Sequence, residues 1–179
     1  MQAQPENHVQ KHVMLWRETS PIWEIVAGEI VVQQYDSLGN DASVLAGRGA
    51  GRADEAAELA HENDLDAAGH ALIGCAVALA LAARAEMEEP TPIEPFVSDI
   101  AAAISWDAHE PDPVELAGLG DEIARCVGPT RGYGQPTLWE LAVRAGSYAA
   151  GMSAHITRRR KRRDMMASNG DSNGDADAV

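Results

Sequence analysis

Four ionisable residues recur at every fourth position in the middle of the chain. They are Glu58, Glu62, Asp66 and His70. On one continuous helix these side chains would share a face, because residues four apart are neighbours on a helix surface. Carboxylate oxygens bind hard divalent cations, and an imidazole nitrogen is a common further ligand. The spacing therefore predicts a candidate metal site, with a solvated acidic helix face as the alternative interpretation.

The last two of these residues belong to a longer motif, Asp66-Ala-Ala-Gly-His70-Ala-Leu-Ile-Gly74. It resembles the motif helix of the FtsH-type zinc metallopeptidases, which is His-Glu-Ala-Gly-His-Ala followed by apolar residues. In that family two His four residues apart hold Zn²⁺, and the Glu activates a bound water. Further along the chain, Leu116-Ala-Gly118 with Glu122 is similar to the family's Leu-Ala-Gly-Arg-x-Ala-Glu helix, and a long helix is expected to follow in the same order.

This sequence departs from the family's pattern at the positions that carry the chemistry. Asp66 stands where the first His belongs, Ala67 replaces the catalytic Glu, and the third ligand position falls near Thr137. Only His70 matches a ligand outright. The resemblance therefore implies a degenerate relative of the peptidase domain, and a cryptic zinc metallopeptidase is the enzyme hypothesis that it leaves open.

A second enzyme hypothesis rests on Glu55-Ala-Ala-Glu58. All-α nucleotide pyrophosphohydrolases present Glu-x-x-Glu and Glu-x-x-Asp on two helices to Mg²⁺ and a nucleoside triphosphate, and this segment resembles the first half. The second half would fall on Ala67–His70, where both carboxylates are missing. We therefore predict a non-catalytic interaction or regulatory protein in preference to an enzyme. The cofactor is unknown, and Zn²⁺ or Mg²⁺ is expected only under the enzyme hypotheses.

Charge is distributed unevenly along the chain. The formal net charge of the 179 residues is −14, and residues 1–157 carry eight Lys or Arg against 24 Asp or Glu. Such an acidic body repels nucleic acid and anionic membranes. We expect a protein partner and no membrane partner.

Six consecutive basic residues follow this acidic body. They form the candidate partner-binding segment: Arg158, Arg159, Arg160, Lys161, Arg162 and Arg163. Nucleic acid could bind only through this segment. The alternative interpretation is that the basic residues merely complement a helix C-terminus and neutralise part of the body's charge.

The two cysteines, Cys75 and Cys126, fall in apolar helical patterns, where a free Cys packs as a small apolar side chain. Two cysteines do not make a disulfide framework, so we expect a reducing cytoplasm. Met1–Gln10 is polar and lacks the apolar core of a signal peptide. Ala67–Ala83 is the one run that approaches a membrane span, and it is shorter than the ~20 apolar residues that a span needs.

Helices are the elements expected to position these residues, because apolar residues recur with the helical period between capping signals. Helix starts are predicted at Ser20-Pro21, at Asp54, at Asp64 after a break at Asn63, at Asp112-Pro113 and at Thr137 with Glu140. A short helix is also predicted at Phe96–Ser105. Gly47–Gly51 is expected to be a flexible connector.

The resulting prediction is an all-α fold, an irregular bundle of five to six helices with a disordered C-terminal tail. Residues 1–18 are expected to form a polar N-terminal arm, residues 19–157 the helical domain, and residues 158–179 a basic and then polar disordered tail. Residues 29–46 have two interpretations. The run Ile30-Val31-Val32 also fits a hairpin that pairs Ile30–Tyr35 with Ala42–Ala46, although we favour the helix.

Overall fold

Helices make up all the regular structure in the part of the chain that the computed structural model describes, residues 20–127 and 134–171. In chain order they are α2 (Ile22–Gln33), α3 (Ala42–His61), α4 (Leu65–Ala85), α5 (Ile93–Trp106), α6 (Pro113–Cys126) and α7 (Leu138–Asp171). The prediction of an all-α bundle of five to six helices is therefore confirmed. The predicted arm at residues 1–18 and the last tail residues, 172–179, lie outside the described residues.

Residues 29–46 form the end of one helix, a turn and the start of the next, so the hairpin alternative is wrong. Ile30 belongs to α2, and Ala42–Ala46 opens α3. Burial explains this outcome, because the buried side chains of α2 follow helical spacing. They are Ile22, Ile25, Val26, Glu29 and Ile30. At the start of α2, Pro21 occupies the N-cap position instead of the predicted Ser20, and no side chain caps the helix.

Asp41 caps the N-terminus of α3. Its carboxylate accepts a hydrogen bond of 2.5 Å from the Ser43 hydroxyl and one of 3.0 Å from the Val44 amide. These hydrogen bonds stabilise the ionised form and lower the pKa of Asp41. Asp54, which we expected to cap this helix, lies in its interior instead.

The glycine-rich segment Gly47–Gly51 lies within α3, so the predicted flexible connector is wrong. Tertiary packing explains why this helix contains Gly49 in particular. A Cβ atom placed on Gly49 would lie 2.9 Å from side-chain carbons of Leu79 in α4. Gly49 therefore permits a close approach of α3 to α4 that a larger residue would prevent.

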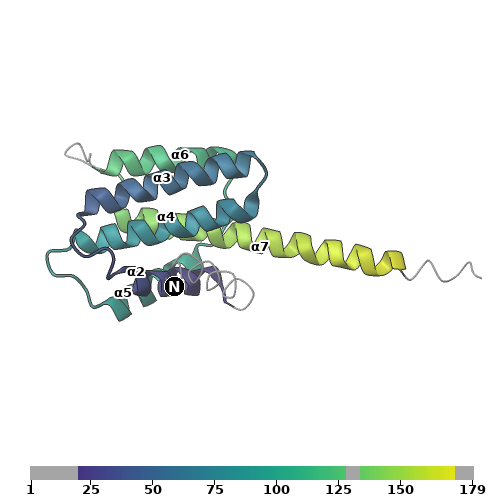
Figure 1. Cartoon of the computed structure of the whole chain (residues 1–179), viewed down its shortest axis with the longest axis horizontal. Coiled ribbons are helices and arrows are strands. Elements are labelled where there is room, and N and C mark those ends of the chain that lie inside the picture. Colours follow the sequence, from purple (N-terminus) through teal and green to yellow (C-terminus); the bar gives the residue numbers. More distant parts are fainter. Residues whose placement is uncertain (1–19, 128–133, 172–179) are drawn as a thin grey trace, which may run out of the picture.

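The chain reverses between α3 and α4, which form an antiparallel helical hairpin (Figure 1). Asn63 adopts a positive φ of 65° at the turn. The carboxylate of Asp64 then accepts a hydrogen bond of 3.2 Å from the amide of Ala67 and caps α4. The predicted helix break and the predicted cap are both confirmed.

Most of α4 is buried, and this helix packs between α3 and α7 (Figure 1). It is long and apolar enough to cross a membrane, with a mean hydropathy of 1.8, but 67% of that window is buried inside the bundle. Such burial is typical of the core helix of a soluble protein, so α4 is weak evidence for a membrane span. Cys75 of α4 and Cys126 of α6 are both buried, as predicted, and form no disulfide with each other.

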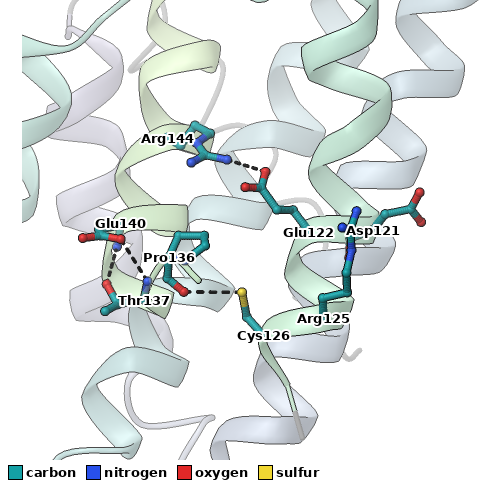
Figure 2. Close-up of polar contacts among 8 residues, drawn as sticks. All are labelled: Asp121, Glu122, Arg125, Cys126, Pro136, Thr137, Glu140 and Arg144. Atoms are coloured by element: carbon teal, nitrogen blue, oxygen red, sulfur yellow. Dashed lines mark hydrogen bonds and ion pairs between the residues drawn. The ribbon is translucent and has the colours of Figure 1, made fainter. Parts of the chain in front are cut away.

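Local capping signals position the later helices as predicted. In α6 the carboxylate of Asp112 accepts from the amide of Glu115 at 2.8 Å, while the Glu115 carboxylate accepts from the Asp112 amide at 3.0 Å. Thr137 and Glu140 make the same reciprocal pair at the start of α7, with distances of 3.1 and 3.0 Å (Figure 2). Each capping box satisfies two helix N-terminal amides that would otherwise lack partners.

α6 and α7 are joined by polar contacts close to the start of α7 (Figure 2). Arg144 of α7 donates to the carboxylate of Glu122 in α6, and both side chains are partly buried. The thiol of Cys126 donates to the carbonyl of Pro136 at 3.4 Å. Glu122, which matches a position of the peptidase family's second helix, is therefore engaged in an interhelical ion pair.

α7 has 34 residues and extends well beyond the rest of the bundle (Figure 1). Its first half is anchored in the core by Leu141, Ala145 and Met152 among others. Residues 157–170 are all exposed. Because α7 continues as helix to Asp171, the loss of regular structure that we predicted from residue 158 on does not occur within this stretch.

Candidate partner-binding site

The basic segment Arg158–Arg163 lies on α7 where this helix leaves the bundle (Figure 1). All six side chains are exposed. Arg160 donates a hydrogen bond of 3.1 Å to the carboxylate of Asp66 in α4. Among the described residues, the other five form no ion pair. The segment is thus tied to the body at one point and presents most of its charge to solvent.

Two hollows lie on either side of the basic segment. The larger, of about 370 Å³, is lined by the turn before α4 and by α7: Asn63, Asp64, Leu65, Asp66, Ile156, Arg159, Arg160 and Arg163. The smaller, of about 200 Å³, is lined by Glu110, His155, Arg158, Arg159 and Arg162. Arg159 borders both hollows, so the two hollows adjoin at this residue.

The loop between α5 and α6 is fixed against α7 beside the smaller hollow. The amide of His109 donates to the carbonyl of Ser147 at 3.3 Å, and the His109 ring packs edge-on against Tyr148 at 5.0 Å. Glu110 lies 3.2 Å from the Nδ1 atom of His155. Gly151 allows this contact, because a Cβ atom there would overlap the backbone of His109. The loop therefore has a defined position from which it lines the neighbouring groove.

A larger groove of about 620 Å³ is lined by residues of α3, α4, α6, α7 and this loop. Its apolar lining comes from Ala57, Ala60, Leu65, Pro111, Pro113, Leu116, Ala117 and Met152. Glu58, His61 and Glu110 supply its polar lining. The groove is thus an apolar surface with an acidic rim, and an apolar side-chain row could fill it.

The four candidate metal ligands are divided between two helices. Glu58 is in α3, Glu62 follows its last residue, and Asp66 and His70 are in α4. The continuous helix that would align them is therefore absent, because the chain reverses at Asn63 and Asp64. Glu58 lines the apolar groove, whereas Asp66 lines the larger basic hollow. No group of three His, Cys, Asp or Glu side chains suited to hold a metal occurs within residues 20–127 and 134–171.

The third position that corresponds to a peptidase ligand, Thr137, lies far from the first two. Asp66 contacts Arg160, whereas Thr137 immediately precedes α7. The 23 residues from Thr137 to Arg160 span about 34 Å along a helix at 1.5 Å per residue. Figure 1 shows α4 and α7 running in opposite directions, so the first turns of these two helices lie toward opposite ends of the bundle. The structure does not bring Thr137 to His70.

The acidic pair from the nucleotide hydrolase hypothesis is exposed on α3. Glu55 forms an ion pair with Arg52 one turn earlier, at 3.0 Å. Glu58 faces the groove, where its neighbours are mainly apolar side chains. Among the residues that line the groove with Glu58, none is a carboxylate from a second helix.

Sequence reasoning missed the groove, because its lining comes from four helices and a loop that are spread along the chain. It also gave no role to Met165 and Met166, which are 66% and 76% exposed just after the basic segment. Two exposed apolar residues beside six cations are the sequence signal that could have marked this part of α7 as a contact surface. No family model, curated protein or solved structure matches this chain.

Proposed function

We propose that this chain is a non-catalytic interaction module that binds an acidic protein segment through Arg158–Arg163. The observation that carries this proposal is the continuation of α7 past the bundle, which holds six exposed cations on one continuous helix. Guanidinium groups bind carboxylates in paired, directional hydrogen bonds. Met165 and Met166 add flexible apolar contacts that suit a varied protein surface.

An acidic protein segment fits this site better than a nucleic acid does. Duplex DNA carries one charge per about 1.7 Å and extends far beyond a site of this size. Such a polymer would be repelled by the body, since residues 1–157 carry a formal net charge of −16. A short acidic segment could instead contact the arginines without crossing the acidic surface.

Two features support a non-catalytic role over the metal-dependent hydrolase hypotheses. Asp66 and Ala67 replace the His and Glu that the peptidase chemistry uses. Arg160 also lies beside Asp66 and presents a cation where a metal would have to bind. The two buried cysteines form no disulfide with each other, which fits a reducing compartment, so we propose that the module acts in the cytoplasm.

Binding of a fluorescent 14-residue polyglutamate peptide tests this function. We expect weak binding that falls steeply with salt, and its loss in the Arg158→Glu/Arg162→Glu variant. The Arg48→Glu/Arg125→Glu variant changes the net charge equally on α3 and α6 and should bind normally. Absence of binding, or equal losses in both variants, would contradict the proposal. Tighter binding of duplex DNA or of phosphatidylserine vesicles would show that the partner class is wrong.

A further inference from the structure

The groove and the two basic hollows form one continuous surface around α7. Leu65 lines both the groove and the larger hollow, and Glu110 lines both the groove and the smaller hollow. Arg159 is common to the two hollows. The shared residues show that the three depressions adjoin, so one ligand can contact the apolar groove and the arginines together.

The charge of this surface changes from one part to the next. Glu58 and Glu110 border the groove, and the described groove lining includes no Lys or Arg. Arg158, Arg159 and Arg162 border the hollow that begins at Glu110. A ligand that follows the surface therefore meets an apolar floor with acidic edges first and a cluster of cations next.

We infer that the partner segment is an amphipathic helix whose apolar face fills the groove and whose acidic residues are confined to the end at the arginines. This inference rests on the proposed function and names the class of partner for it. Apolar anchors at positions i, i+3 or i+4 and i+7 are the usual means by which a helix occupies such a groove. Carboxylates placed over the groove would be repelled by Glu58 and Glu110, so only the terminal turn can be acidic.

Selection from a displayed library of random helical peptides against the full-length chain tests the inference. We expect enriched sequences to combine an apolar row with Asp or Glu at one end. Ala117 is exposed and lines the groove. The Ala117→Arg variant fills the groove with a long side chain. It should therefore bind the enriched peptides about tenfold or more weakly. Ala124→Arg places the same charge two turns further along α6, away from the groove lining, and should have no such effect.

The outcomes separate this inference from the proposed function. If the peptides bind the Arg158→Glu/Arg162→Glu variant weakly but bind Ala117→Arg normally, the arginine site is supported and binding in the groove is contradicted. Enrichment of basic peptides, or of none, would overturn the inference. In that case, continued binding of polyglutamate to the arginines would show that the proposed function survives without it.

Discussion

Arg160 of α7 and Asp66 of α4 form an ion pair of 3.1 Å across 94 positions of the sequence. One residue belongs to the candidate partner-binding segment, and the other is a candidate metal ligand by its spacing. The pair ties the projecting part of α7 to the first turn of α4. A guanidinium at this distance also opposes a second cation at the same carboxylate.

We predict that this ion pair contributes little to the stability of the fold. The side chains of Arg160 and Asp66 are 67% and 46% exposed, and such pairs contribute about 0.2–1 kcal/mol. A double-mutant cycle with Asp66→Asn and Arg160→Gln, followed by urea denaturation, measures the coupling energy. The coupling should shrink in 1 M salt. The Asp66→Asn/Arg159→Gln cycle is the control and should show almost none, whereas strong salt-independent coupling would contradict the prediction.

Two glycines of α3 should respond in opposite directions to replacement by alanine. A Cβ atom on Gly47 has no neighbour within 4 Å, so Gly47→Ala should stabilise the protein by about 0.5–1 kcal/mol through reduced backbone entropy of the unfolded chain. A Cβ atom on Gly49 would lie 2.9 Å from Leu79. Gly49→Ala should therefore cost roughly 1–3 kcal/mol. Urea denaturation of both variants gives the comparison, and equal shifts would show that α3 and α4 are not packed this closely.

Replacing Gly151 should displace the loop that lines the groove. A Cβ atom there would overlap the backbone of His109 and Glu110, which cannot move as a flexible side chain would. We expect Gly151→Ala to destabilise the fold by roughly 1–3 kcal/mol and to shift the amide resonances of residues 107–110 and of Asp112. Gly118→Ala in α6 is a suitable control, because its Cβ atom would meet no neighbour within 4 Å. Unchanged stability and spectra in Gly151→Ala would contradict the close contact.

Features set by neighbouring residues could be predicted from the sequence, and those set by distant contacts could not. The capping boxes at Asp112 and Thr137 and the cap at Asp64 depend on side chains within three residues of each other, and all three are present. The glycines of α3 indicated a loop because local propensity disfavours them in helices. The close packing of Gly49 involves Leu79, which is thirty positions away and cannot be found from a local pattern.

The candidate site followed the same division. The basic segment was visible as a run of charge, because it requires no knowledge of the fold. The sequence did not indicate that this segment projects from the bundle. The projection depends on the first half of α7 being packed in the core, which is a tertiary contact (Figure 1). The candidate metal site required Glu62 and Asp66 to lie on one continuous helix, and the chain reversal at Asn63 places Glu62 at the end of α3 and Asp66 in α4.

Stability should fall at high pH because of Cys75. Burial, and to a smaller extent the charge of Asp54, raises the pKa of this thiol to about 12 from the ordinary value of 9.0. Between these values the unfolded chain binds fewer protons than the folded one, so alkaline conditions favour unfolding. The contribution of Cys75 to stability should be constant below pH 9 and then fall by roughly 1.4 kcal/mol per pH unit up to about pH 12. Urea midpoints at pH 8 and 10 test this, and Cys75→Ala should lose this part of the pH dependence; an identical dependence in both proteins would contradict it.

The exposed end of α7 should open far more readily than its anchored half. Residues 157–170 are exposed, whereas Leu141, Ala142 and Ala145 are completely buried in the bundle. Helical segments of about a dozen residues are marginally stable without tertiary packing. Native-state hydrogen exchange should therefore show little protection for the amides of residues 163–170 and strong protection for those of residues 142–150. An acidic helical peptide bound to the arginines should raise protection in the first group alone. Strong protection of residues 163–170 in the free chain would instead show that this end of α7 is already covered, for example by a second copy.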